Sequence, residues 1–314
     1  MKFALVFPGQ GSQSVGMMAA YGETAMIRKT FDEASSAIGR DLWALAADGP
    51  PDALNQTVNT QPLMLTAGVA VYRLWREVGG AAPAIMAGHS LGEYSALVAA
   101  GVMKLSDAVT LVELRATAMQ EAVPAGEGAM AAVLGLDADA VKLACTEVMA
   151  QVSGQVVEAV NFNDPKQIVI AGHKAAVERA AEVVKARGAK RALMLPVSAP
   201  FHSSLMQTAA QRLKQRLLLV PMALPQIPII NNVDVSLLTD GEAIRDALVR
   251  QASSPVRWVE IMLRMQAFGV THVLECGPGK VLAGLSKRCS DNLTGVAMND
   301  LVSLEAALAM TRVS

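Results

Sequence analysis

Three shortages limit the classes of protein that this 314-residue sequence can encode, and the first is a shortage of cysteine. The three cysteines, Cys145, Cys276 and Cys289, are far apart, and none belongs to a C-x-x-C pair. Three isolated cysteines supply neither a disulfide framework nor a cluster of thiolate ligands for a metal. We therefore expect no metal site and no redox cofactor, and a reducing cytoplasm as the location of the protein.

Aromatic and charged residues are the other two shortages. Aromatic residues make up 4% of the chain and charged residues 18%, whereas hydrophobic residues make up 52%. This profile is typical of a compact enzyme with a large aliphatic core, and it offers few rings on which nucleic-acid bases could stack. The opening apolar run, residues 3–7, ends at Pro8, and no run reaches the roughly 18 residues that a membrane span requires. The sequence therefore predicts no nucleic-acid partner, no membrane partner and no signal peptide.

The formal net charge of −1 conceals a difference between the two halves of the chain. Residues 1–157 hold 9 Lys+Arg and 15 Asp+Glu, a balance of −6, whereas residues 158–314 hold 18 and 13, a balance of +5. One interpretation is an ordinary scatter of solvated charges. The other is a basic face that binds an acidic partner.

The hydrophobic pattern changes at about residue 126 and predicts a second, inserted unit. Strands expected at 130–134, 155–160, 167–171 and 191–195 alternate with two helices in the order βαββαβ, which is the ferredoxin-like pattern. We therefore predict an α/β protein with one subdomain at 126–196 and another at 1–125 and 197–314. The larger subdomain is expected to have strands at 3–7, 84–87, 227–233 and 271–276, and helices that include 90–100 and 106–120, the latter capped by Ser106.

Gly88-His89-Ser90-Leu91-Gly92 matches the G-x-S-x-G pattern and lies between a predicted strand and a predicted helix. A serine on such a sharp turn exposes its hydroxyl, because the two glycines let strand and helix approach each other. The start of the helix also directs backbone N–H groups at any oxyanion that forms there. Ser90 is therefore a candidate nucleophile; the alternative is that it only caps the helix.

A serine nucleophile needs a base, and the chain has only four histidines. His89 is adjacent to Ser90, and neighbouring side chains on such a sharp turn point in different directions. His173 and His272 adjoin strands and are interpreted as surface or structural residues. His202 lies in an irregular loop far downstream, and it is the candidate base. The alternative is a helix cap or a surface histidine. No aspartate is evident as a third member, and a backbone carbonyl could orient the imidazole instead.

Arg115 is an unusual residue for its position in a predicted helix. Leu111, Val112, Ala118 and Met119, at i−4, i−3, i+3 and i+4, lie on the same helix face as Arg115. An arginine within an apolar stripe is costly unless an anion meets it. Its role is either a bidentate clamp for a substrate carboxylate or, alternatively, an internal ion pair or a side chain that extends to solvent.

Two glycine-rich loops fail the requirements of phosphate-binding loops. Gly9-Gln10-Gly11 follows a strand, but Ser14 occupies the position of the third glycine of a dinucleotide motif, and residues 277–280 lack the spacing of a P-loop. Both are better interpreted as turns where the backbone passes close to a ligand or another strand. The first turn could supply an oxyanion N–H beside that of Leu91.

These motifs occur in an order and at spacings that make nearly the whole chain resemble the malonyl-CoA:acyl carrier protein transacylases. The resemblance rests on residues 7–13, 88–94, 115, 161–163, 199–202, 251–258 and 275–282. It implies that Ser90 carries the malonyl ester, that His202 is its general base and acid, and that Arg115 binds the malonyl carboxylate.

The same resemblance implies further roles and a fold. Backbone N–H groups of Gln10 and Leu91 would form the oxyanion hole, and Gln251 would orient His202 through its main-chain carbonyl. Phe201, directly before His202, resembles the residue at this position in malonyl-selective members of the family, which implies that larger branched acyl groups are disfavoured. The implied fold is a hydrolase-like α/β core with a mainly parallel sheet and the ferredoxin-like insertion, with the site between them.

The implied partners are malonyl-CoA and holo acyl carrier protein, in fatty-acid biosynthesis, with the enzyme a monomer and no cofactor. Three alternatives stay open at this point. The chain could be a hydrolase such as an esterase or thioesterase, which needs no carboxylate clamp, or a non-enzymatic subunit that retains the fold. It could also load malonyl groups for polyketide synthesis.

Overall fold

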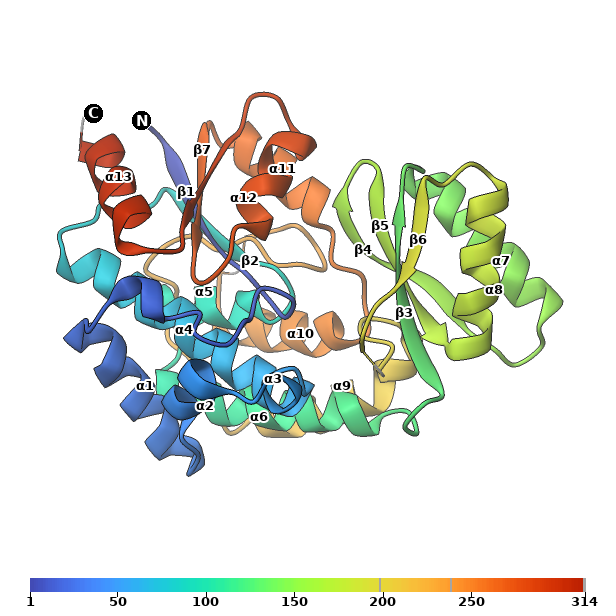
Figure 1. The fold of residues 1–314 in the computed structure, drawn as a ribbon, viewed down its shortest axis with the longest axis horizontal. Coiled ribbons are helices and arrows are strands. Elements are labelled where there is room, and N and C mark those ends of the chain that lie inside the picture. Colours follow the sequence, from blue (N-terminus) through green and yellow to red (C-terminus); the bar gives the residue numbers. More distant parts are fainter. Residues whose placement is uncertain (198, 238, 313–314) are drawn as a thin grey trace.

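The computed structural model describes residues 1–197, 199–237 and 239–312, and its larger unit is built on a four-stranded sheet (Figure 1). The strands lie in the order β2-β1-β7-β8, and all three pairings are parallel. Their bounds are Phe3–Phe7 for β1, Ile85–Gly88 for β2, His272–Cys276 for β7 and Thr294–Met298 for β8. This confirms the predicted α/β class with a mainly parallel sheet.

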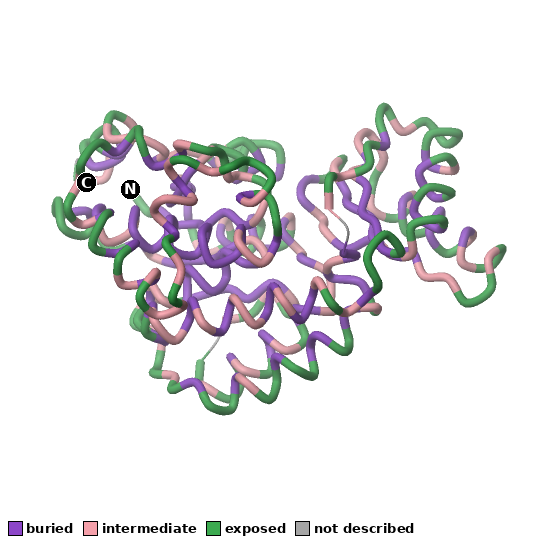
Figure 2. Tube along the Cα trace, turned by 60° about the horizontal axis from the view of Figure 1, so that its bottom comes forward, coloured by how far each residue is buried: buried purple, intermediate pink, exposed green. Residues whose placement is uncertain are grey.

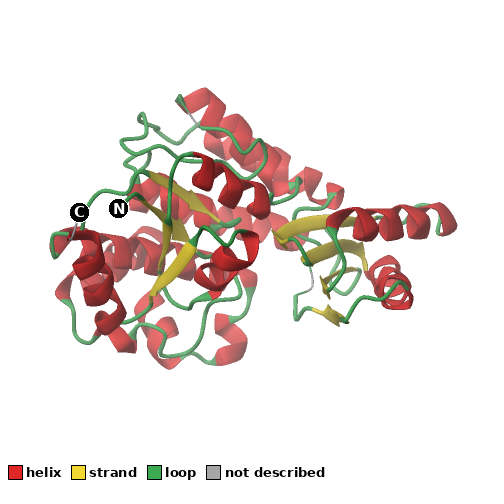
Figure 3. Cartoon of the chain, turned by 90° about the horizontal axis from the view of Figure 1, so that it is seen from above, coloured by secondary structure: helices red, strands yellow, loops and turns green. Residues whose placement is uncertain are grey.

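Helices cover both faces of this sheet (Figure 3). Phe3, Leu5 and Phe7 of β1 point into one apolar core, whereas Ala4 and Val6 point into another, as the alternation of side chains along a strand requires. The helices of the unit are α1 (Ala25–Ile38), α2 (Leu42–Asp48), α3 (Pro51–Leu54), α4 (Thr57–Glu77), α5 (Gly92–Ala99), α6 (Leu105–Glu121), α9 (Gln207–Leu217), α10 (Gly241–Ala252), α11 (Trp258–Ala267), α12 (Val281–Cys289) and α13 (Leu301–Arg312), with 3-10 turns at Ala19–Tyr21 and Ser204–Met206.

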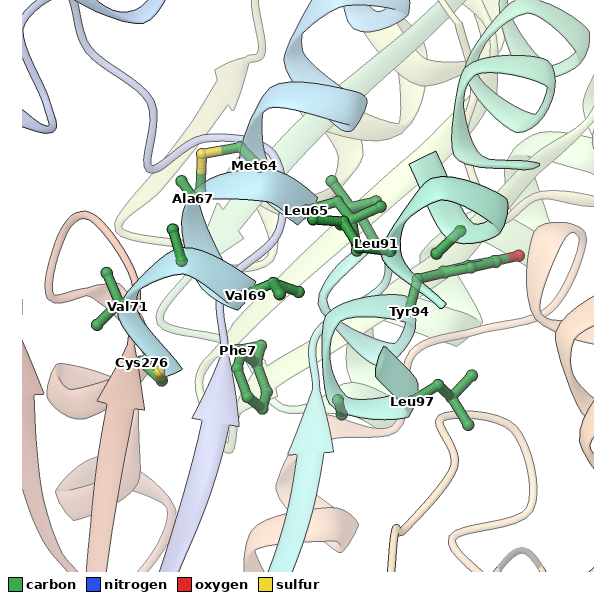
Figure 4. Packing of buried hydrophobic residues seen from close by; sticks show 14 of the residues in the cluster. Phe7, Met64, Leu65, Ala67, Val69, Val71, Leu91, Tyr94, Leu97 and Cys276 are labelled. Atoms are coloured by element: carbon green, nitrogen blue, oxygen red, sulfur yellow. The ribbon is translucent and has the colours of Figure 1, made fainter. Parts of the chain in front are cut away.

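The first core contains helix α4, in which 15 of 21 residues are buried. Buried segments run through the middle of this unit in Figure 2, with exposed residues at its periphery. Figure 4 shows Leu65 and Val69 of α4 beside Phe7 at the end of β1 and Leu91 and Tyr94 around the start of α5. This packing fixes the start of α5 against the end of the sheet, which is where the candidate nucleophile lies.

A second sheet forms a separate lobe at the right of Figure 1. Its strands are β3 (Gly128–Leu134), β4 (Val157–Asp164), β5 (Gln167–His173) and β6 (Arg191–Met194), antiparallel in the order β4-β5-β3-β6. Helices α7 (Ala138–Gln151) and α8 (Lys174–Ala186) pack on one face of this sheet. The predicted order βαββαβ is therefore confirmed, while the exact division of the chain at residues 126 and 196 stays a prediction.

Two local predictions are wrong, and one strand lacks a prediction. Residues 227–233 form only two isolated bridges, at Ile229 and Ile230, because Pro228 has no N–H to donate and the chain turns at Asn231. Strand β8 was not predicted, since its mostly half-buried residues at the edge of the sheet give a weak pattern. Ser106 is not a cap, because α6 begins at Leu105.

Among the described residues, no helix combines the length and the apolar character that crossing a membrane requires.

Candidate active site

Ser90 lies on the sharp turn between β2 and α5, which we call the elbow (residues 88–92). Its backbone conformation is strained, with φ 52°. A Cβ atom on Gly88 would lie 1.8 Å from the carbonyl carbon of Gly92, and one on Gly92 would lie 2.0 Å from the Phe7 carbonyl oxygen. Only glycine fits at either position, so the two glycines of the motif are required by packing. The predicted strand–turn–helix context is confirmed, although the helix begins at Gly92 and not at Ser90.

His202 is the histidine that contacts the serine. Its Nε2 lies 2.6 Å from Ser90 Oγ, and its Nδ1 lies 2.9 Å from the main-chain oxygen of Gln251. A carbonyl oxygen only accepts, so Nδ1 carries the proton and Nε2 presents a lone pair to the serine. Burial, followed by the charge of Arg115, lowers the pKa of His202 to about 3, which keeps the imidazole neutral and leaves its Nε2 lone pair available to the serine.

The other three histidines make different contacts. His89 Nε2 lies 2.8 Å from Asn163 Oδ1, and its ring packs at 5.3 Å from that of Trp258. His173 Nδ1 accepts from the Val156 amide, and His272 begins β7. The assignment of His202 by elimination therefore agrees with the geometry.

Arg115 projects from α6 to the serine and is only 2% exposed. Its Nη2 donates to Ser90 Oγ at 3.2 Å and to Gln251 Oε1 at 3.0 Å, and its Nη1 donates to Gln61 Oε1 at 2.6 Å. These acceptors are all neutral, and the buried Nε has no acceptor among the described residues. The side chain does not extend to solvent, and it has no direct ion-pair partner within the described ranges, which leaves the substrate clamp among the interpretations of Arg115.

The donors around Ser90 Oγ also settle the direction of its own proton. Arginine only donates, so the hydroxyl oxygen accepts from Arg115, and the hydroxyl hydrogen is left for the lone pair of His202 Nε2. This is the arrangement that general-base activation of a serine requires.

Gln10 and Leu91 line a small cavity of about 120 Å³, together with Ser90. Gly9 holds the first loop against the elbow, since a Cβ there would lie 2.7 Å from the His89 carbonyl oxygen. Within the described ranges neither the Gln10 nor the Leu91 amide donates a hydrogen bond. Two unused N–H groups at the rim of one cavity are suited to an oxyanion.

The cavity lies between the two lobes. Its walls include Met119 of α6, Met130 of β3 and Phe201 beside the base, and the rest of the lining is formed by Gln61, His89, Asn161, Leu195, Val197 and His202. The apolar side chains form part of the wall of the cavity, whereas Arg115 supplies a buried positive charge.

Two residues for which the sequence predicts no role support the site. Asn232 accepts from the Ser90 amide through Oδ1 at 2.8 Å and donates through Nδ2 to the Gly88 oxygen at 2.8 Å. Glu93 accepts from the Asn232 amide and from Gln251 Nε2, at 3.0 and 2.8 Å. The Asn231-Asn232 pair after an apolar run is the only local signal that could have pointed to the first of these residues.

The fold and the contact between Ser90 and His202 indicate the class of enzymes that act on acyl groups. The family model described as "Acyl transferase domain" matches residues 4–305. The malonyl CoA-acyl carrier protein transacylase of Escherichia coli (strain K12) is 56% identical over 310 residues, which is 98% of this chain and 99% of that protein. The malonyl CoA-acyl carrier protein transacylase of Bacillus subtilis (strain 168) is 44% identical over 308 residues, which is 98% of this chain and 96% of that protein.

Solved structures agree with this result. The acyl-carrier-protein S-malonyltransferase of Burkholderia pseudomallei 1710b has a TM-score of 0.96 and 59% identity, and the match covers 98% of this chain and 100% of that one. A malonyl-transacylase in complex with a type II polyketide synthase acyl carrier protein has a TM-score of 0.96 and 52% identity, with coverage of 99% and 100%. The chain belongs to the acyl transferase family, and within it to the malonyl CoA-acyl carrier protein transacylases.

Proposed function

We propose that this enzyme transfers the malonyl group of malonyl-CoA to the phosphopantetheine thiol of holo acyl carrier protein, in fatty-acid biosynthesis, through a malonyl ester on Ser90. The observation that carries the proposal is Arg115, a buried cation with neutral acceptors. Its Nη2 lies 3.2 Å from Ser90 Oγ, and its Nε has no acceptor among the described residues. A substrate carboxylate would satisfy that cation and place the acyl carbonyl beside Ser90.

In the first half-reaction His202 Nε2 takes the hydroxyl proton as Ser90 Oγ attacks the thioester carbon. The oxyanion accepts hydrogen bonds from the Gln10 and Leu91 amides, then the carbon–sulfur bond breaks. The proton on His202 passes to the departing thiolate of coenzyme A, which leaves the malonyl ester on Ser90.

The second half-reaction runs the same steps with a different thiol. His202 takes the proton of the carrier's phosphopantetheine thiol, whose sulfur attacks the ester carbon. The bond to Ser90 Oγ breaks, and His202 returns the proton to the serine. Both steps use one base and one pair of backbone donors. That the reaction requires no metal and no redox cofactor stays a prediction.

The alternative of a hydrolase is less well supported. An esterase needs water beside the acyl-enzyme and has no use for a buried arginine, whose burial is costly without an anion. The test is the intact mass of the protein after malonyl-CoA is added, with Ser90→Ala as the control. The expected result is one malonyl adduct on the wild type only, which then moves to holo carrier protein; release of free malonate without carrier would favour the hydrolase.

The basic second half of the chain suits an acidic carrier protein. Lys190 and Arg191 are exposed at the start of the edge strand β6 and are proposed to contact the carrier. Reversing both to glutamate should raise the KM for carrier protein several-fold while the KM for malonyl-CoA is unchanged. Lys29→Glu, an exposed lysine on α1, is the control, and an unchanged KM for carrier would remove Lys190 and Arg191 from the docking surface.

The same assay distinguishes the pathways. A fatty-acid carrier protein and a polyketide carrier protein are compared as acceptors, because one solved relative is bound to a polyketide carrier. A preference for the polyketide carrier would overturn the fatty-acid assignment. The monomeric state and the cytoplasmic location stay predictions.

A further inference from the structure

Glu93 is a buried carboxyl group that the proposed mechanism does not use. It is the second residue of α5, three positions after the nucleophile, and it is fully buried. Its Oε2 accepts from Gln251 Nε2 at 2.8 Å and from the Asn232 amide at 3.0 Å, while its Oε1 has no partner among the described residues. A carboxyl group in such a place is costly, so its contacts need an explanation.

The Gln251 side chain has two ends, of which Oε1 faces one donor and Nε2 faces two acceptors. Its Oε1 accepts from Arg115 Nη2 at 3.0 Å, and its Nε2 donates to Glu93 and, at 3.0 Å, to the Ser90 main-chain oxygen. If the amide were reversed, its NH₂ group would face the guanidinium, donor against donor, and its oxygen would face two acceptors. The neighbours of Nε2 therefore decide which end faces Arg115.

We propose that Glu93 is a positioning residue that fixes the Gln251 amide so that Oε1 aims the Arg115 guanidinium at the acyl carboxylate. The inference rests on the proposed function, in which Arg115 recognises malonyl. Gln251 also holds His202 through its main-chain oxygen, but that contact belongs to the backbone of α10 and does not depend on which way the side-chain amide faces. Loss of Glu93 should therefore reduce the recognition of the carboxylate more than it reduces acyl transfer itself.

The neutral form of the carboxyl group can still accept from Gln251. Burial raises the pKa of Glu93 to about 7, so the protonated form is accessible near neutral pH. Glu93→Gln keeps an acceptor oxygen in the same place and is the conservative variant. Glu93→Met removes the acceptor at similar volume, and Glu93→Asp keeps the charge but withdraws it by one methylene group.

The experiment measures kcat/KM for malonyl-CoA and for acetyl-CoA, which lacks the carboxylate, with the same holo carrier protein. In Glu93→Met the ratio of kcat/KM for malonyl-CoA to kcat/KM for acetyl-CoA should fall about tenfold. This is the effect of losing one hydrogen bond to a charged group, here the bond from Arg115 Nη2 to Gln251 Oε1. In Glu93→Gln it should stay within about threefold of wild type. If Glu93→Met does not fold, as judged by circular dichroism, Glu93→Asp should show the same fall.

Arg115→Met separates this inference from the proposed function. If Arg115→Met loses the malonyl preference and the Glu93→Met and Glu93→Asp variants that fold keep theirs, the role of Glu93 is wrong and the clamp stands. If Arg115→Met keeps the malonyl preference, the clamp itself is wrong. A parallel fall for both substrates in the Glu93 variants, with the ratio unchanged, would mean that Glu93 is only structural and would also overturn the inference.

Discussion

Asn232→Ala tests how the strained nucleophile is held. Asn232 is fully buried and satisfies two backbone groups of the elbow, the Ser90 amide and the Gly88 oxygen. Both lose their partner in the variant. Each unsatisfied buried group costs about 1–3 kcal/mol, so the free energy of unfolding should fall by about 2–4 kcal/mol if water replaces part of the loss.

The same change should affect catalysis. The left-handed conformation of Ser90, with φ 52°, costs about 1–2 kcal/mol and persists only while its surroundings hold it. Without the acceptor on its amide, the Ser90 backbone can relax and move Oγ away from His202 Nε2, now 2.6 Å away. We expect kcat to fall about 10- to 100-fold with little change in the KM for malonyl-CoA.

Asn231→Ala is the matched control. Asn231 is the neighbouring residue, equally buried, and its side chain bonds to Ser236 and to the Asp234 amide but not to the elbow. It should lose stability in urea unfolding while its kcat stays within about threefold of wild type. The reasoning fails if Asn232→Ala keeps a wild-type kcat, or if both variants lose kcat equally.

Three further predictions follow from named contacts. Because the pKa of His202 lies at about 3, acylation of Ser90, followed by intact mass, should keep its rate from pH 8 to pH 5; a loss with a midpoint between pH 6 and 7 would contradict the neutral, buried base. Thr57 Oγ1 links two side chains, because it accepts from Gln61 Nε2 at 3.2 Å and donates to Gln10 Oε1 at 2.7 Å. Thr57→Val removes this link, so kcat/KM for malonyl-CoA should fall about tenfold. An unchanged value would show that Gln10 needs no such support. Burial raises the pKa of Glu275 to about 7 from an ordinary 4.5, so the folded chain binds the proton more tightly than the unfolded chain. The wild type should then lose stability relative to Glu275→Gln as the pH rises from about 4.5 to about 7, in urea unfolding at each pH, and a difference independent of pH would refute it.

The parts of the molecule that the sequence predicted are those that local sterics determine. The spacing of Gly88 and Gly92 around Ser90 is required by contacts within the elbow itself and with β1, so the motif could be recognised without a structure. Arg115 could be singled out because a charge in an apolar stripe is visible in helical periodicity. The second sheet was predicted because its strands and helices alternate regularly along 128–194.

The parts that were missed depend on contacts between distant segments. Asn232 and Glu93 meet across 139 positions of the chain, and no spacing rule connects an asparagine after a proline-containing segment to a glutamate after an elbow. Strand β8 gains its identity from pairing with β7, and residues 227–233 lose theirs because Pro228 interrupts the ladder. Such elements are decided by tertiary packing, which overrides a short hydrophobic pattern.

The contact between Arg115 and Ser90 connects substrate choice to reactivity in the proposed function. With no carboxylate in place, Nη2 donates to one of the two lone pairs of Ser90 Oγ, and such a hydrogen bond lowers the nucleophilicity of the oxygen. A substrate carboxylate would bind Nη2 and Nε together, as the planar fork of the guanidinium favours, because Nε has no acceptor in the part of the chain that the structure describes. It would thereby draw the donor away from the nucleophile. An acyl group without a carboxylate would leave that donor on Ser90 Oγ. The guanidinium would thus select malonyl by its effect on the attacking oxygen as well as by binding.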